Sequence, residues 1–186
     1  MESSDKTDDI EILKRIENGD NDAVTELYNT HVDRIYSLIL NQVDSDREMA
    51  QEILQETFIA AVRSAGKFRG KSKVYTWLCS IASRKVADYY RYKKRETKHR
   101  VQYSVDSDEI QDTSDNIITI LESEETNKGV RKTLFSLPIH YRQVLLLKYV
   151  EKLPVSEISE IMERSPKSIE GLLTRARKEF QAKLTG

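Results

Sequence analysis

The sequence predicts an all-α protein built from two small helical domains joined by a flexible acidic linker. Apolar residues recur with the 3.6-residue spacing of a helix in almost every segment, and no segment alternates convincingly with the period of two that strands require. Glycine and proline are scarce, at 6 and 3 of 186 residues, as long helices require. A chain of this length suits one or two small domains, each with a modest core of its own.

Four helical segments are expected in the N-terminal half, over residues 9–18, 22–42, 46–64 and 73–95, with a loop at residues 66–72. Their apolar residues share helical faces: Val24, Leu27, Tyr28, Ile35, Tyr36 and Ile39 in the second segment, and Met49, Ala50, Ile53, Leu54, Phe58 and Ala61 in the third. Gly19 closes the first segment. We therefore predict a first domain at residues 20–95, preceded by an extension at residues 1–19 that carries the short first helix.

Charge is segregated along the chain, although the formal net charge is only -1. Residues 84–100 are strongly basic, whereas every charged residue at positions 104–127 is acidic. Blocks of like charge are typical of solvated, mobile chain or of an interaction surface. We therefore expect residues 96–126 to form a flexible acidic linker.

A second helical domain is expected at residues 127–186. Pro138 is predicted at the first position of a helix that carries Val144, Leu145, Leu147 and Val150, and Pro154 introduces a short helix. The final helix opens at Ser165-Pro166. The serine oxygen can cap the first amides, and proline is suited to the first helical position because the N–H it lacks would have no partner within the helix there. Its apolar residues share one side: Ile169, Leu172, Leu173, Ala176 and Phe180.

The opposite side of this final helix is polar and basic, with Lys167, Ser168, Glu170, Gly171, Thr174, Arg175, Arg177 and Lys178. Such charged and polar side chains are unsuited to a core, whereas the cations among them can bind the phosphate backbone of a nucleic acid. Two helices, a tight turn and this last helix together predict a DNA-reading helix-turn-helix.

Aromatic residues and cations are interleaved from the end of the loop through the fourth helix: Lys71, Lys73, Tyr75, Trp77, Arg84, Lys85, Tyr89, Tyr90, Arg91, Tyr92, Lys93 and Lys94. Aromatic faces can stack on unpaired bases while cations follow phosphates. Trp77 shares a helical face with Leu78 and other apolar residues, which favours a place in the core. Tyr89, Tyr90 and Tyr92 cannot all point inward, so at least one should be exposed.

Other features limit the chemistry that the chain can perform. His31, His99, His140 and Cys79 show no metal-ligand spacing and no catalytic constellation is evident, so we expect neither an enzyme nor a metal or other cofactor. The single cysteine allows no internal disulfide. With no run of eighteen apolar residues and an acidic N-terminus, we expect a soluble, cytoplasmic protein. In the third helix, Gln51, Glu52, Gln55 and Glu56 are either ordinary solvated positions or a docking surface for a basic partner.

These segments occur in an order that resembles the extracytoplasmic-function (ECF) sigma factors, small two-domain subunits of bacterial RNA polymerase. The resemblance covers roughly residues 20–94 and 127–184. It rests on Trp77-Leu78 followed by Ile81-Ala82, on Leu137-Pro138 followed by Arg142, and on Arg175-Ala176-Arg177. Each motif is weak alone, but together, in order and at the proper spacing, they are specific.

The resemblance implies three binding surfaces. One contacts the clamp helices of the largest polymerase subunit, through Asp46, Gln51, Glu52, Leu54, Gln55, Glu56 and Phe58. One binds the -10 promoter element, through Lys71, Ser72, Lys73, Tyr75, Trp77, Arg84, Lys85, Asp88 and Arg91. One binds the -35 element, through Arg142, Ser165, Lys167, Ser168, Glu170, Gly171, Thr174, Arg175, Arg177 and Lys178.

Two departures from the family pattern stand out. Arg84 occupies a position that is usually Asn, and Glu170-Gly171 replaces a frequent Lys or Arg followed by Ser. A glutamate can accept a hydrogen bond from the amino group of a cytosine in the major groove.

We therefore expect a sigma factor that directs core RNA polymerase to specific promoters and initiates transcription, in response to stress or an envelope signal. Its partners are core polymerase, through the clamp helices and the flap, promoter DNA and an anti-sigma factor, with no small-molecule substrate. The alternative is a stand-alone helix-turn-helix regulator that binds an operator as a dimer.

Overall fold

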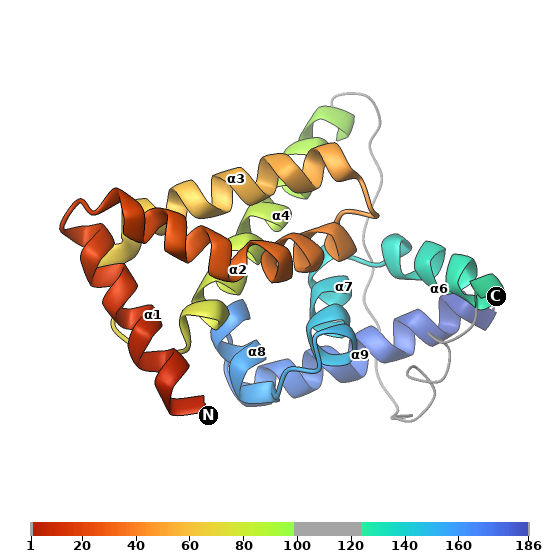
Figure 1. Ribbon diagram of the computed structural model, residues 1–186. Coiled ribbons are helices and arrows are strands. Elements are labelled where there is room, and N and C mark those ends of the chain that lie inside the picture. The colour runs from red at the N-terminus through yellow and green to blue at the C-terminus, as the bar shows by residue number, and fades with distance from the viewer. Residues whose placement is uncertain (1, 99–123, 186) are drawn as a thin grey trace. The chain divides into compact units, whose positions relative to one another are not determined.

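The computed structural model describes residues 2–98 and 124–185, and within these residues every element is a helix (Figure 1). The prediction of an all-α protein is confirmed. The chain divides into two compact units, residues 1–86 with 160–162 and residues 87–159 with 163–186. No helix in the described part of the chain is long and apolar enough to cross a membrane.

The first unit contains α1 (Glu2–Glu17), α2 (Asn21–Gln42), α3 (Arg47–Ser64), the short 3₁₀ helix η1 (Ala65–Lys67) and the start of α4 (Val74–Lys98). α2 packs along α3, and α1 packs on α2 and η1 (Figure 1). The core includes Leu27, Ile35 and Ile39 of α2 and Ala50, Ile53 and Ala61 of α3, all at most 4% exposed. The apolar faces predicted for these two helices are therefore confirmed at these positions, whereas Tyr28 is 41% exposed.

Three boundaries differ from the prediction. α1 begins at Glu2 rather than at residue 9, although its buried side chains Ile12, Leu13 and Ile16 all lie within the predicted segment. The expected loop at residues 66–72 begins with the 3₁₀ turn of η1. The expected linker at residues 96–126 lies largely outside the described residues, and its two ends belong to α4 and to α6 (Glu124–Ser136).

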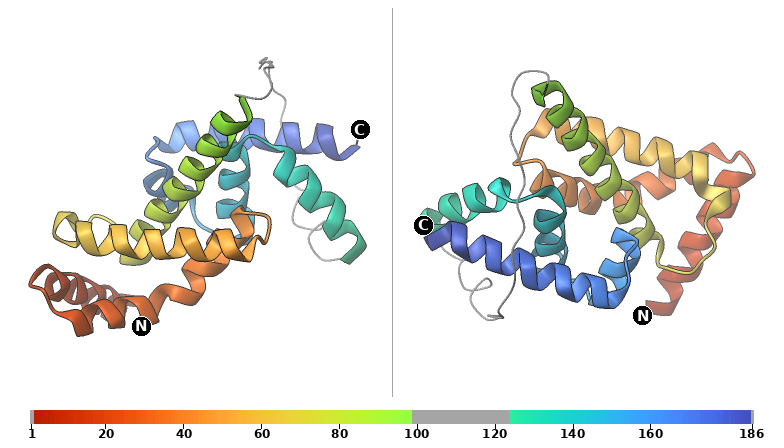
Figure 2. Two further views of the ribbon diagram at one scale, coloured as in Figure 1. Left: turned by 90° about the horizontal axis from the view of Figure 1, so that it is seen from above. Right: turned by 180° about the vertical axis from the view of Figure 1, so that it is seen from behind.

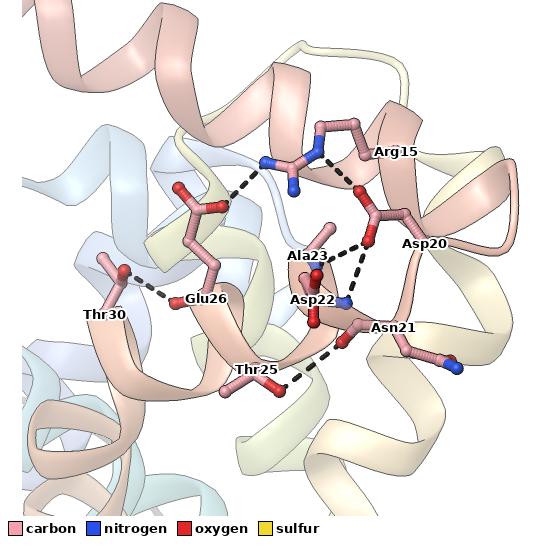
Figure 3. Close-up of polar contacts among 8 residues, drawn as sticks. All are labelled: Arg15, Asp20, Asn21, Asp22, Ala23, Thr25, Glu26 and Thr30. Carbon is pink, nitrogen blue, oxygen red and sulfur yellow. Dashed lines mark hydrogen bonds and ion pairs between the residues drawn. The ribbon is translucent and has the colours of Figure 1, made fainter.

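The junction between α1 and α2 is fixed by local chemistry (Figure 3). Gly19 adopts a φ of 86°, which favours glycine, and its N–H donates to the carbonyl oxygen of Ile16 at 3.0 Å. Asp20 then caps α2 by accepting from the amides of Asp22 at 2.9 Å and Ala23 at 3.2 Å. Arg15 bridges Asp20 and Glu26, with a donor–acceptor distance of 2.8 Å to each. One carboxylate thus joins both helices.

The second unit contains α6, α7 (Ile139–Leu145), the π-helical turn η2 (Leu146–Val150), most of α8 (Val155–Met162) and α9 (Pro166–Thr185). α7 lies against the long α9, and α6 also contacts α9 (Figure 2). The apolar face predicted for α9 is confirmed, because Ile169, Leu172, Leu173, Ala176 and Phe180 are all at most 7% exposed. The predicted start of α9 is also confirmed: Ser165 Oγ accepts from the amide of Ser168 at 3.3 Å, and Pro166 is the first helical residue.

The helix after Pro138 departs from the prediction at both ends. Pro138 is the residue before the helix rather than its first residue. At the other end the chain widens into η2, where the amide of Glu151 donates to the carbonyl oxygen of Leu146 at 3.0 Å. This five-residue hydrogen bond changes the angular position of the residues that follow. Val150, predicted with the apolar residues of this helix, is the last residue of η2 and is 40% exposed.

The hydrogen bond from Arg15, followed by the amide of Ala23, holds the pKa of the Asp20 carboxyl below its ordinary value. The charged form is therefore favoured by folding, so its stabilisation is present above the ordinary aspartate pKa and is lost as the pH falls below about 4. We expect Asp20→Asn to lower the Tm at pH 7 and to converge with the wild type in acid, as measured by circular dichroism.

The matched control is Asp22→Asn, which removes a charge from the same helical turn but leaves the cap intact. It should lower the Tm less than Asp20→Asn at neutral pH. A constant difference in Tm between Asp20→Asn and the wild type from pH 7 to pH 3 would contradict the role assigned to this carboxylate.

Candidate nucleic-acid and polymerase interfaces

The side of α3 that faces away from its core carries the polar cluster predicted for polymerase binding. Gln51, Glu52, Gln55 and Glu56 are all exposed. Asp46 has a structural role as well, because it caps α3 by accepting from the amide of Met49 at 3.0 Å. We call Gln51, Glu52, Gln55, Glu56 and Ile59 the α3 outer face. The assignment of its polar residues to polymerase stays a prediction.

Two apolar residues predicted for polymerase binding are buried in the core of the first unit. Leu54 is 6% exposed and Phe58 is 7% exposed. The ring of Phe58 packs against that of Tyr28, with centroids 4.9 Å apart. These two side chains position α3, and any partner would reach them only in part.

Sequence reasoning missed Ile59, which is 51% exposed. It falls on the polar side of α3, one turn after Gln55 and two turns after Glu52. A single exposed apolar residue is common on protein surfaces. Its place on the polar side of the helix is nevertheless typical of an interface anchor surrounded by polar contacts. The sequence signal that could have found Ile59 is that this apolar residue does not follow the helical period of the buried face of α3.

At the start of α4, the structure separates the predicted -10 residues into exposed and buried sets. Lys71, Lys73 and Arg84 are exposed, and Ser72 is half-buried. Trp77 is also half-buried and packs on Phe68, with ring centroids 5.2 Å apart. Part of the Trp77 side chain therefore remains accessible beside the cations.

Tyr75 was predicted to contact DNA, but it is 7% exposed. The guanidinium of Arg34 lies over its ring at 3.7 Å, and the ring of His31 is stacked with it at a centroid distance of 6.4 Å. An arginine over an aromatic face is a favourable cation–π arrangement. In this structure Tyr75 supports the start of α4 and has no open ring face for a base.

The polar residues further along α4 are held by neighbours. Arg84 donates from Nε and Nη2 to the Ser80 carbonyl and hydroxyl oxygens, both at 3.2 Å. Lys85 forms an ion pair with Glu56 of α3 at 2.9 Å. Asp88 and Arg91 pair with each other one helical turn apart. Tyr92 is 63% exposed, which confirms that at least one of the three tyrosines here is exposed.

The side of α9 opposite its buried face is the third candidate surface. Ser165, Lys167, Glu170, Arg175 and Lys178 are exposed, whereas Ser168, Gly171, Thr174 and Arg177 are half-buried. We call Lys167, Glu170, Gly171, Thr174, Arg175 and Lys178 the α9 outer face.

Two arginines predicted for the -35 element have internal roles. Arg142 is 3% exposed, and its guanidinium lies over the ring of Phe135 at 4.4 Å. Arg177 donates to the hydroxyl oxygen of Tyr149 at 3.4 Å and to that of Thr174 at 3.5 Å. Both side chains therefore help to hold the helices of the second unit, which leaves them less available to DNA.

The charge near α9 is reflected in the pKa of His140. Burial lowers this pKa first, and the positive charges of Arg164 and Arg175 lower it further against the opposing effect of Glu179. No group of three His, Cys, Asp or Glu side chains within residues 2–98 and 124–185 could hold a metal ion.

Comparison with known protein families gives one match in each half of the chain. Residues 27–96 match the family described as Sigma-70 region 2, and residues 129–180 match Sigma-70 region 4. The two matches together cover about two thirds of the chain. The chain belongs to the sigma-70 family of RNA polymerase sigma factors and is of the ECF type.

Known sigma factors match along nearly the whole of both chains. The chain is 28% identical to the ECF sigma factor SigW of Bacillus subtilis over 183 residues, which covers 92% of this chain and 94% of SigW. It is 26% identical to the ECF sigma-E factor of Haemophilus influenzae over 181 residues, which covers 93% of each chain. The resemblance found from the motifs is therefore confirmed.

Solved structures show the same fold. The sigma factor RpoE of Bartonella quintana, in complex with the anti-sigma factor NepR, matches with a TM-score of 0.63 and 17% identity over 87% of this chain and 96% of RpoE. CnrH, in complex with the cytosolic domain of CnrY, matches with a TM-score of 0.62 and 21% identity over 95% of this chain and 97% of CnrH.

Gly171 offers a direct test of how α9 is built. A Cβ added at this position would meet no atom within 4 Å, and its backbone does not adopt a positive φ. Glycine in a helix interior costs about 0.5–1 kcal/mol relative to alanine. We expect Gly171→Ala to raise the free energy of unfolding by about this amount, measured by urea denaturation.

Gly66→Ala is the opposite case, because an added Cβ would lie 2.5 Å from the Glu17 side chain. The glutamate would have to move, so this variant should gain less stability than Gly171→Ala. If Gly171→Ala destabilised the protein, the outer side of α9 would have to be packed rather than open.

Proposed function

We propose that this sigma factor binds core polymerase with the α3 outer face, the -10 element with the start of α4 and the -35 element with the α9 outer face. The observation that carries the proposal is the two-sided character of α9, a helix with one side entirely buried and the other bearing Lys167, Arg175 and Lys178. The matches to regions 2 and 4 of the sigma-70 family support it.

The first step would be docking of the α3 outer face on the clamp helices of the largest polymerase subunit. The four polar residues of this face are exposed without any core role, and Ile59 can supply an apolar contact at its centre. The ion pair between Glu56 and Lys85 links this helix to α4. Docking would therefore also hold α4 in place.

Residues 70–74 and the start of α4 would then capture an unstacked base of the -10 element. Extruding a base costs a few kcal/mol, which stacking and hydrogen bonds in a pocket can return. Lys71 and Lys73 are exposed for phosphate contacts, and Trp77 keeps part of its side chain accessible. In this mechanism capture of the base drives strand separation, and the sigma factor itself makes and breaks no covalent bond.

α9 would lie in the major groove of the -35 element, as recognition helices of this motif do. Lys167, Arg175 and Lys178 would divide their contacts between phosphates and bases. We also propose that the protein acts in the cytoplasm, uses neither a cofactor nor a small-molecule substrate, and contacts the polymerase flap through its second domain.

An anti-sigma factor is a further proposed partner. Both structural neighbours described above were solved in complex with such an inhibitor or, for CnrH, with the cytosolic domain of CnrY. An inhibitor that holds the protein until a stress or envelope signal arrives would fit the resemblance to the ECF type. For the domains, we retain boundaries at residues 20–95 and 127–186.

Run-off transcription tests the function directly. Purified core RNA polymerase is supplied with pooled genomic fragments from the source organism, with and without this protein. We expect new, discrete transcripts whose upstream sequences share -10 and -35 elements. No transcripts, together with tight binding of the protein alone to a palindromic duplex, would instead support a stand-alone dimeric regulator.

The docking surface is tested by charge reversal at Glu52. A lysine on the α3 outer face would meet a basic partner with a like charge, and such pairs cost several kcal/mol in an interface. We expect Glu52→Lys to weaken the affinity for core polymerase by at least about tenfold, measured by fluorescence anisotropy of the labelled protein.

The matched control is Asp33→Lys, the same charge change at an exposed position on α2, opposite its buried face. It should bind core polymerase as the wild type does. Equal losses of affinity in the two variants would point to a general effect of net charge and would remove the α3 outer face from the docking surface.

A further inference from the structure

The line of α9 that points most directly away from its core carries four residues. With 100° per residue, Lys167, Gly171, Thr174 and Lys178 fall opposite the buried face, and Glu170 and Arg175 lie to either side. Two cations therefore stand at the ends of this line, and its two middle positions carry no charge.

Thr174 presents its methyl group rather than its hydroxyl. The hydroxyl donates its single proton to the Glu170 carbonyl oxygen at 3.0 Å, and its oxygen accepts from Arg177 at 3.5 Å. The proton is therefore not free to reach an acceptor on a base. The remaining group at the end of this side chain is apolar.

Gly171 lies one helical turn before Thr174 on the same line. Neither its backbone angle nor its packing requires a glycine, because an added Cβ would meet nothing within 4 Å of the protein itself. A residue that weakens the helix without an internal reason indicates close approach by something outside the chain. Gly171 therefore makes this part of α9 the place where a partner can come nearest to the helix backbone.

The spacing of the cations matches a groove. Lys167 and Lys178 are separated by about 16 Å along the helix axis, from the rise of 1.5 Å per residue. The major groove is about 12 Å wide, so long lysine side chains at these two positions can reach phosphates on both sides of it. The uncharged middle of the line would then face the base edges.

Only one base edge in the major groove carries an apolar group, the C5-methyl of thymine, and a threonine methyl is among the side-chain groups that contact it. We propose that Gly171 and Thr174 read a thymine methyl group in the -35 element, with Gly171 allowing the approach and Thr174 making the contact. This inference rests on the proposed role of α9, and it adds the identity of the base group that α9 recognises.

The test replaces thymine with deoxyuridine, which removes the methyl group and keeps base pairing. A promoter identified by run-off transcription is synthesised with each -35 thymine replaced in turn on either strand, and affinity is measured with holoenzyme assembled from the full chain and core polymerase. We expect one replacement to weaken binding about fourfold, the value of one buried methylene-sized group.

Thr174→Ser identifies the reader, because serine keeps the hydroxyl and lacks the methyl. On the thymine promoter this variant should bind about as weakly as the wild type binds the uracil promoter, and the uracil replacement should cost it nothing more. Gly171→Ala should bind the promoter more weakly despite its open surroundings. The control is Gly129→Ala in α6, where an added Cβ would also meet nothing within 4 Å. This variant should bind the promoter as the wild type does.

The outcomes separate this inference from the function on which it rests. An absence of run-off transcripts would overturn both. Transcripts from a promoter with no -35 thymine, or with thymines whose replacement leaves affinity unchanged, would overturn the inference alone. So would a loss on uracil replacement that is the same size in Thr174→Ser as in the wild type.

Discussion

Burial of a single apolar face on each long helix is the constraint on which both the cores and the candidate surfaces depend. In α9, five residues from Ile169 to Phe180 are packed inside the second unit, and this packing fixes the rotation of the helix about its axis. The same holds for α3, whose buried face includes Ile53 and Phe58. Because the buried face fixes this rotation, the residues on the opposite side point to solvent in a defined arrangement without needing further contacts.

Internal contacts then decide which polar side chains remain available on those outer sides. Arg142 lies over an aromatic ring, and Arg177 is held by the hydroxyl groups of Tyr149 and Thr174. The contact from Arg177 also orients the threonine that we assign to base reading. On the α9 outer face the exposed cations are Lys167, Arg175 and Lys178, which form a smaller set than charge alone indicates.

Features that depend on neighbours in the chain were predictable from the sequence. Gly19 determines where α1 ends, and Ser165-Pro166 determines where α9 begins, because left-handed backbone and helix capping are local properties. The exposure of Val150 was not predictable in the same way. This residue ends the π-helical turn at residues 146–150, which the regular 3.6-residue period does not describe.

The sequence by itself determined the helical class, the apolar faces of α2, α3 and α9, the segregation of charge and the family, since these need only periodicity, local chemistry and motif order. The tertiary structure decided which candidate residues are accessible. It placed Leu54 and Phe58 in a core, covered the ring of Tyr75 with Arg34 and exposed Ile59. The physical reason is that accessibility depends on helices distant in the sequence, whose packing no local pattern describes.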